Sequence, residues 1–208
     1  DGDSQLLNTN ADTIASAVAV AMSGRYETSL IYCFEKRGVM KDIDDEKAKL
    51  LLFLFATGSR LGEARVLQLQ DCNINQQIAY LPTSKSGRER LIPLNQFALE
   101  LVQLQRQRHG TTGLLFRGQD CVSPISEPRR YWYRVCNDCG LSGVRIHDTR
   151  HSVATSLLNK GCSLDVLQKV LGHSSPRMTE RYARFYDATL VKAVDALHTV
   201  WALPNLTC

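Results

Sequence analysis

Residues 146–186 read IHDTRHSVATSLLNKGCSLDVLQKVLGHSSPRMTERYARFY, and the caps and glycines in this stretch predict a series of short helices. The first helix is expected over about 148–160, closed by the glycine that follows. Ser163 can cap a second helix, which ends at Leu171 before another glycine. The serine and proline after that glycine open a third helix, which contains Tyr182. The last third of the chain is therefore predicted to be helical.

Apolar periods and turn residues predict the elements on either side of this stretch. Two β-prone runs, 78–81 and 90–94, flank the turn-rich segment TSKSGR and predict a hairpin. The fold is therefore expected to be mostly α with a small antiparallel β-sheet (α+β). The other expected helices cover 13–22, from 42–45 to about 56, from about 60 to before 71, 96–109, 126–139 and 187–202.

Composition limits the class of protein. The chain has 208 residues, of which 44% are hydrophobic and 22% charged, so a sizeable core is expected. The formal net charge of +4 allows a nucleic-acid partner without requiring one. Seven cysteines at irregular spacing favour a reducing compartment, so a cytoplasmic location is expected. Apolar runs stay below the roughly 18 residues that span a bilayer, so no membrane segment is expected. Because the chain starts at Asp1, it is expected to be part of a longer protein.

Two pairs of polar residues lie about one helical turn apart. Arg60 and Glu63 would share a face of a helix, and the simplest interpretation is a surface ion pair. His147 and Arg150 would also share a face, which a polar helix start explains equally well. Arg, however, binds phosphate oxygens with its planar fork, and His exchanges a proton near neutral pH. The second pair therefore also suits a phosphodiester.

Three further residues are ambiguous when taken singly. Lys85 lies at the expected hairpin tip, where a charged side chain is usually just solvated but can also enter a DNA groove. His173 lies in a tight link between two helices, where a histidine commonly bonds to the backbone. Tyr182 has Arg181 and Arg184 nearby and, on its own, would be a core or groove residue.

Together these residues follow one order along the chain, and the segments around them resemble the tyrosine recombinase (phage integrase) family. The resemblance covers roughly residues 45–186 and implies the catalytic-domain fold of that family. Ser59 stands where the family often has a bulkier residue, and Thr149 where Leu is more usual. Residues 1–44 match no part of the family and are expected to be an extension or linker. The segments that carry the resemblance are ATGSRLGE (56–63), TSKSGRERLIPL (83–94), IHDTRHSVAT (146–155) and LGHSSPRMTERYAR (171–184).

The resemblance implies a reaction and a role for each residue. Tyr182 attacks a DNA phosphodiester and forms a 3′-phosphotyrosine, which a 5′-hydroxyl of another strand then resolves, so neither ATP nor a metal is needed. Arg60 and Arg150 hold the non-bridging oxygens, and Lys85 protonates the leaving 5′-oxygen. The remaining implied roles are a base or phosphate hydrogen bond for His147, a phosphate hydrogen bond for His173, orientation of an Arg or a neighbouring His by Glu63, and DNA contacts for Arg88, Arg90 and Arg181.

The family also implies partners and a biological setting. A site-specific recombinase (integrase) acts on double-stranded DNA, in integration or excision, and is expected to be encoded by a bacterium or a phage. Because such recombinases work as tetramers, we expect a homo-tetramer on DNA and a monomer without it, with no cofactor or metal. Residues 187–208 are expected to form a C-terminal helix and tail. The apolar face of 188–201 either packs on its own core or docks into a neighbouring protomer.

Three other interpretations stay open at this point. A catalytically inactive relative would bind DNA without cutting it, although the full polar set is present here. A type IB topoisomerase or a telomere resolvase would use the same tyrosine chemistry, although LGHSS and the short chain favour the integrase branch. A zinc protein would use Cys136, Cys139, His147 and His151, but the helix that carries the two cysteines is expected to bury one or both as small hydrophobes.

Overall fold

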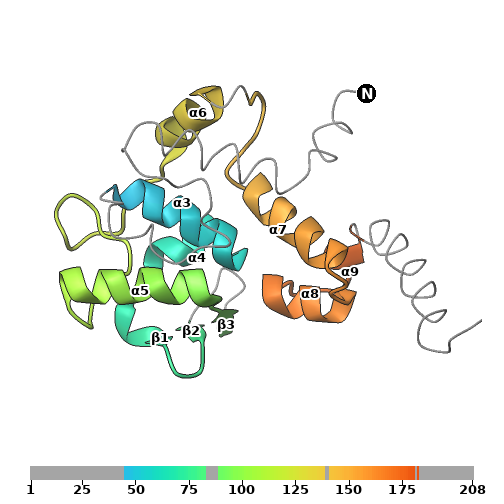
Figure 1. The fold of residues 1–208 in the computed structure, drawn as a ribbon, viewed down its shortest axis with the longest axis horizontal. Coiled ribbons are helices and arrows are strands. Elements are labelled where there is room, and N and C mark those ends of the chain that lie inside the picture. Colours follow the sequence, from blue (N-terminus) through green and yellow to red (C-terminus); the bar gives the residue numbers. More distant parts are fainter. Residues whose placement is uncertain (1–44, 83–88, 139–140, 181, 183–208) are drawn as a thin grey trace, which may run out of the picture. The chain divides into compact units, whose positions relative to one another are not determined.

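The computed structural model describes residues 45–82, 89–138, 141–180 and 182, and its helices and strands are labelled in Figure 1. The chain divides into two compact units, residues 1–153 and residues 154–208. The segments expected as helices at 13–22 and 187–202, and the hairpin tip at 83–88, lie outside the described residues.

Helix α3 (Glu46–Thr57) is the central element of the first unit. Asp45 caps its start by accepting a hydrogen bond from the backbone N–H of Lys47 at 2.7 Å, and Gly58 ends it in the left-handed conformation at φ 63°. Its apolar run Leu50–Phe55 is buried throughout. Helices α4 (Leu61–Val66) and α5 (Gln96–His109) both pack against α3, as Figure 1 shows.

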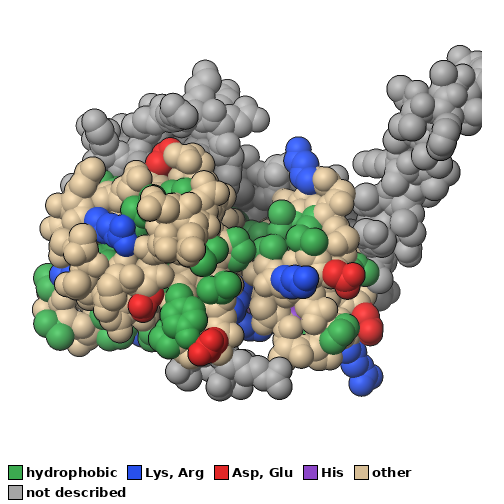
Figure 2. All heavy atoms as spheres, turned by 90° about the horizontal axis from the view of Figure 1, so that it is seen from below, with side chains coloured by type: hydrophobic (Ala, Val, Ile, Leu, Met, Phe, Trp, Pro, Cys, Tyr) green, Lys and Arg blue, Asp and Glu red, His purple; other side chains and the backbone are tan. Residues whose placement is uncertain are grey.

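A three-stranded antiparallel sheet follows α4, in the order β1 (Cys72–Asn73), β2 (Ile78–Leu81) and β3 (Arg90–Pro93). The predicted hairpin of β2 and β3 is confirmed, whereas β1 is too short to have been predicted from a β-prone run. Ala79 pairs with Ile92 on the buried face, and Tyr80 pairs with Leu91 on the exposed face. Figure 2 views the molecule from the side on which the sheet lies in Figure 1 and shows hydrophobic side chains at that surface.

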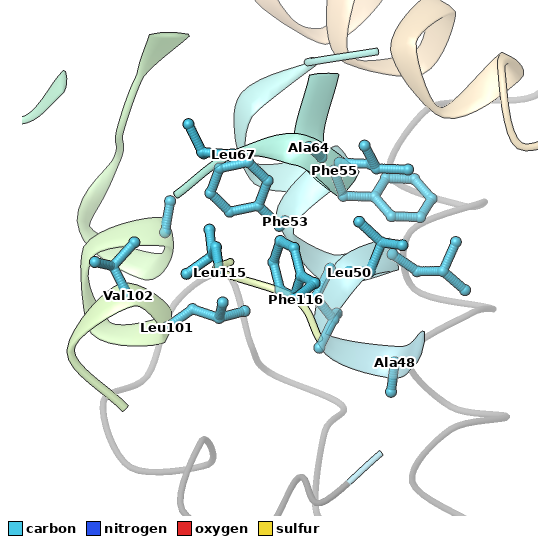
Figure 3. Close-up of a cluster of buried hydrophobic side chains, with 14 of the residues drawn as sticks. Ala48, Leu50, Phe53, Phe55, Ala64, Leu67, Leu101, Val102, Leu115 and Phe116 are labelled. Carbon is cyan, nitrogen blue, oxygen red and sulfur yellow. The ribbon is translucent and has the colours of Figure 1, made fainter. Parts of the chain in front are cut away.

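The core of the first unit lies between α3, α5 and the segment around residue 115, as Figure 3 shows. The rings of Phe53 and Phe116 meet edge to face with their centroids 5.5 Å apart. The segment is fixed by a backbone hydrogen bond of 2.8 Å from Leu115 N–H to the Leu67 carbonyl. Gln105 donates to the Leu115 carbonyl at 2.7 Å and so satisfies a buried acceptor. Helix α6 (Arg129–Asp138) adds the buried Trp132.

The second unit contains α8 (Leu164–Leu171) and α9 (Arg177–Glu180), together with the later part of α7 (Asp148–Asn159), within which the boundary between the units falls. Ser163 caps α8 by accepting a hydrogen bond from Val166 N–H at 3.3 Å, as its position before the apolar run predicts. The small core of this unit consists of Ala154, Leu158, Leu167, Leu171 and Tyr182.

Three predictions about element boundaries are corrected. Helix α4 ends at Val66, because the backbone of the next residues pairs with residues 113–115 and then forms a short 3₁₀ turn (η3, Leu69–Asp71). Helix α6 begins at Arg129, three residues later than the start expected at Ser126. His147 lies in the turn directly before α7, whose observed start at Asp148 agrees with the helix expected over about 148–160. Tyr182 lies in a turn after α9, where its N–H bonds to the Thr179 carbonyl three residues back at 2.9 Å. The other expected helices among the described residues are confirmed.

Within the described ranges, each helix is too short or too polar to cross a bilayer.

Candidate functional site

The loop between α3 and α4 positions Arg60. Thr57 closes α3 by donating from its hydroxyl to the Phe53 carbonyl at 2.7 Å, and the same hydroxyl lies 2.9 Å from that of Ser59. Both side chains are buried, so the small Ser59 fits inside this turn. Gly58 supplies the left-handed turn that leads the chain into Arg60, the N-cap residue of α4.

Arg150 reaches the same loop from the first turn of α7. Its side chain is buried, and its Nη1 donates a hydrogen bond to the Gly58 carbonyl at 2.7 Å. A guanidinium presents its donors as a planar fork, a geometry that suits the binding of phosphate oxygens. The first unit therefore brings Arg150 to the short turn at Gly58 that leads into Arg60, the other arginine predicted to bind phosphate.

Glu63 lies beneath Arg60 and accepts hydrogen bonds from two arginines. Its Oε1 accepts from Nη1 of Arg60 at 2.7 Å, and its Oε2 accepts from the backbone N–H of Arg60 at 2.9 Å and from Nη1 of Arg90. The carboxylate is 4% exposed, so the pair is not the surface ion pair that spacing alone suggests. Burial raises the pKa of Glu63, but the charge of Arg90 and the hydrogen bonds of Arg60 outweigh it, so the pKa lies below its ordinary value.

His147 lies beside these cations in the turn before α7. Loss of solvent around the ring lowers the pKa of His147, and the charges of Arg150, Arg145 and Arg60 lower it further against the opposing effect of Asp148. The imidazole is therefore neutral at pH 7 and can accept a proton or a hydrogen bond. Its ring meets that of His151 edge to face, with the centroids 5.2 Å apart.

A pocket of about 320 Å³ opens at this point in the first unit. Its lining includes His147, Arg150 and Ser59, and also Arg145 and Arg129, which the sequence analysis did not single out. Arg145 is largely exposed and donates to Asp148 at 3.1 Å. Its place directly before the IHDTR segment was the signal available in the sequence. The pocket thus combines cationic donors with a neutral imidazole, a set suited to an oxyanion such as a phosphodiester.

The second unit holds His173 and Tyr182 around Thr179. Gly172 ends α8 in the left-handed conformation, and the N–H of His173 bonds back to the Gln168 carbonyl at 3.0 Å, a Schellman arrangement that fixes the histidine. The ring Nδ1 of His173 lies 2.7 Å from Oγ1 of Thr179, while the Thr179 carbonyl accepts from Tyr182 N–H. Thr179 was not predicted as a site residue, although its hydroxyl-bearing side chain lies between His173 and Tyr182 in the sequence.

Tyr182 is 4% exposed and packs in the small apolar core of the second unit. The surrounding apolar side chains hold the ring in place. A phosphate that reacts with the Tyr182 hydroxyl must therefore gain access to it. Of the two placements expected for a lone tyrosine, core or groove, the ring therefore takes the core position.

The other predicted site residues divide into two groups. Lys85, Arg88 and Arg181 lie outside the described residues. Arg90 lies at the start of β3 with a side chain only 6% exposed and paired with Glu63. This placement argues against the DNA contact predicted for Arg90, because a guanidinium buried against a carboxylate is not available to a phosphate.

No cluster of three His, Cys, Asp or Glu residues that could hold a metal occurs within the described parts of the chain. Of the residues considered for zinc, Cys136 is buried in the core of the first unit, as expected of a small hydrophobe, and Cys139 lies outside the described residues.

Comparison of the sequence with known proteins gives consistent matches. Residues 30–189 match the family model described as the phage integrase family. The tyrosine recombinase XerD of Vibrio cholerae is 32% identical over 147 residues, which are 66% of this chain and 48% of that protein. The tyrosine recombinase XerA of Pyrococcus furiosus is 28% identical over 151 residues, 70% of this chain and 52% of that protein. The chain thus spans about half the length of these relatives.

Solved structures share the fold. The XerH site-specific recombinase bound to a palindromic difH substrate, in a post-cleavage complex, has a TM-score of 0.61 at 22% identity and covers 90% of this chain and 51% of its own. The Tn1549 transposon integrase in complex with transposon right end DNA has a TM-score of 0.57 at 20% identity and covers 73% of this chain and 59% of its own. The predicted fold, mostly helical with a small antiparallel sheet, is therefore confirmed.

Proposed function

We propose, from the premise that this chain belongs to the phage integrase family, that it is the catalytic part of a site-specific recombinase. In this proposal it cuts and rejoins double-stranded DNA through a 3′-phosphotyrosine on Tyr182. The bond energy of the phosphodiester is kept in the tyrosyl ester, so the rejoining step requires no ATP and no metal.

The observation that carries this proposal is the arrangement of Arg60 and Arg150 around the turn at Gly58. The reaction passes through a phosphorane-like state that carries added negative charge on its non-bridging oxygens. Fixed donors aimed at such charge contribute about 3–4 kcal/mol each. The two arginines are held by the protein before any DNA arrives, Arg60 by Glu63 and Arg150 by the Gly58 carbonyl, so little reorganisation is needed when the charge develops.

The proton transfers are assigned to residues on both sides of the scissile bond. Neutral His147 serves as a base or forms a hydrogen bond with the phosphate, and Lys85 donates a proton to the leaving 5′-oxygen. His173 donates from its ring to a phosphate oxygen. Its bond to Thr179 through Nδ1 supports this role because it fixes the orientation of the ring.

We further propose a homo-tetramer on DNA, formed from monomers, and a cytoplasmic, DNA-associated location in a bacterium or phage-infected cell. The apolar spacing of residues 188–201 supports exchange of this segment between protomers. The odd number of cysteines, seven, and their irregular spacing support a reducing compartment.

The experiment is covalent trapping. The chain is incubated with a pool of duplexes that have randomised centres and a nick placed so that the short 5′-hydroxyl fragment diffuses away after cleavage. Adducts that survive detergent are digested, and the phosphotyrosyl peptide is identified by mass spectrometry, while the attached DNA is sequenced to give the target site. Adducts at Tyr182 are expected.

The same experiment separates the alternatives. DNA retention without any adduct would identify an inactive DNA-binding relative and refute the proposal. Adducts combined with relaxation of supercoiled plasmid, but no strand exchange between duplexes, would identify a topoisomerase-like enzyme instead.

A further inference from the structure

We propose that Arg90 is a positioning residue that holds Arg60 through the shared carboxylate of Glu63 and does not itself touch DNA. The proposal rests on the proposed function, because positioning matters only if Arg60 holds the reacting phosphate.

The two arginines that share Glu63 differ in their exposure. The side chain of Arg60 is 27% exposed, whereas that of Arg90 is 6% exposed and that of Glu63 is 4% exposed. Only Arg60 therefore presents its guanidinium towards solvent and an incoming ligand. Arg90 faces inward from the start of β3. The three side chains are therefore linked in sequence: the buried Arg90 binds the buried carboxylate of Glu63, which in turn binds the partly exposed Arg60.

The charge of Arg90 helps to keep the carboxylate of Glu63 ionised. Burial alone raises the pKa of Glu63, and the strongest opposing influence is the positive charge of Arg90, ahead of the hydrogen bonds from Arg60. Without Arg90, the group would move towards the protonated form, in which one of its oxygens becomes a donor. Arg60 would then lose part of the acceptor pair that holds both its Nη1 and its backbone N–H.

The Arg90–Glu63 ion pair connects two elements that are separate in the sequence, the start of α4 and the β2–β3 hairpin. Arg60 and Glu63 belong to the start of α4, while Arg90 pairs with Leu81 at the turn end of the β2–β3 hairpin. The segment that joins these strands includes Lys85, five residues before Arg90. The buried ion pair between Arg90 and Glu63 therefore ties the turn end of the hairpin to the helix start that presents Arg60. A change at Arg90 is expected to act on catalysis rather than on DNA affinity.

The first test measures the side chain of Arg60 without DNA. Nitrogen-15 NMR of the full chain follows rotation of the Arg60 guanidinium about its Nε–Cζ bond in the wild type, in Arg90→Met and in Arg90→Lys. Slow rotation is expected in the wild type, fast rotation in Arg90→Met, and an intermediate rate in Arg90→Lys, which keeps the charge but loses the fork. Arg106→Met is the matched control, because Arg106 is a structural arginine bonded to the Leu69 and Cys72 carbonyls.

The second test uses the nicked duplex pool. Arg90→Met is expected to slow adduct formation by about ten- to a hundredfold, the range that a small misplacement of a catalytic group costs. Its DNA affinity and salt dependence should match the wild type. In an Arg60→Lys background, Arg90→Met should not slow adduct formation any further, because Arg90 affects cleavage only through Arg60. If Arg90→Met does not fold by circular dichroism, Arg90→Met with Glu63→Gln removes both buried charges and is expected to show the same slow cleavage.

Two results would overturn the proposal. One is an Arg60 guanidinium that rotates as slowly in Arg90→Met as in the wild type. The other is a fall in DNA affinity with a salt slope reduced by about one, the signature of a lost phosphate contact. If the wild type formed no adducts with any DNA, the proposed function would fail, and the NMR comparison would still decide whether Arg90 holds Arg60.

Discussion

The Nη1 of Arg150 donates a hydrogen bond to the carbonyl of Gly58 across 2.7 Å, although 92 residues separate the two in sequence. The same glycine ends α3 in the left-handed conformation and lies two residues before Arg60. One short turn therefore fixes both arginines, and we expect their effects on catalysis to be coupled.

Arg60→Ala and Arg150→Ala should each slow cleavage by about two to three orders of magnitude, as expected when one charge-stabilising donor is removed. Single-turnover adduct formation on the nicked pool gives the rates. The double variant should lose less than the product of the two single losses, because both donors act on one phosphate. Near wild-type rates in both single variants would mean that the phosphate lies elsewhere.

Thr179→Val should slow cleavage about tenfold, because it removes one hydrogen bond from the His173 ring while keeping the shape of the side chain. The backbone bond from Tyr182 to Thr179 is not changed by this substitution. Thr179→Ser restores the hydroxyl and should restore the rate. A serine variant as slow as the valine variant would assign the effect to packing instead.

His147 should govern the acid limb of the pH–rate profile. Its pKa in the folded chain lies below the ordinary 6.5, so the neutral ring persists to lower pH than a free histidine allows. Cleavage is expected to fall only below pH 6.5, and this limb should disappear in a slow His147→Gln variant. His109→Gln is a suitable comparison, because His109 also has a lowered pKa but lies at the end of α5. Loss of the limb in His109→Gln alone would reassign it.

The lowered pKa of His147 also makes the free energy of unfolding depend on pH. Since the folded state holds the proton of His147 more weakly than the unfolded state does, the unfolded state binds more protons as the pH falls below 6.5. The contribution of His147 to the free energy of unfolding is therefore present above that pH and is lost below it. Urea unfolding between pH 7.5 and pH 5 should show a shallower pH dependence in His147→Gln. An unchanged slope would indicate that the ring has an ordinary pKa.

The C-terminal segment should couple assembly to cleavage. Deletion of residues 188–208 is expected to weaken cooperative assembly on DNA and to alter cleavage, because its apolar positions recur at helical spacing. Sedimentation of the intact and shortened chains, with and without the DNA recovered from trapping, measures the assembly. If assembly and cleavage are both unchanged by the deletion, the segment only packs on the core of its own protomer.

The sequence predicted those features that depend on neighbouring residues. Asp45, Asn95 and Ser163 each accept a hydrogen bond from a backbone N–H two or three residues further on, so the helix starts could be predicted from local pattern. The family segments likewise located Arg60, His147 and Arg150, which the first unit brings to one pocket or to the turn beside it.

Features that depend on distant partners could not be predicted in this way. Arg90 looked like part of a basic hairpin tip, and only its pairing with Glu63, 27 residues earlier, shows that it is buried. The early end of α4 has the same origin, since the segment after it pairs with residues 113–115. Thr179 gave no periodic signal, because its importance lies in one hydrogen bond to His173.

The most direct test of the account is covalent trapping with Tyr182→Phe. The substitution removes a single hydroxyl, and the ring keeps its place in the apolar core of the second unit, so folding and DNA binding within a few-fold of the wild type are expected. Wild-type chain should give a detergent-stable adduct on the nicked pool, with DNA attached to the peptide that contains Tyr182, and the phenylalanine variant should give none. An adduct of normal yield in Tyr182→Phe would contradict the account and make Tyr186 the next candidate for the nucleophile.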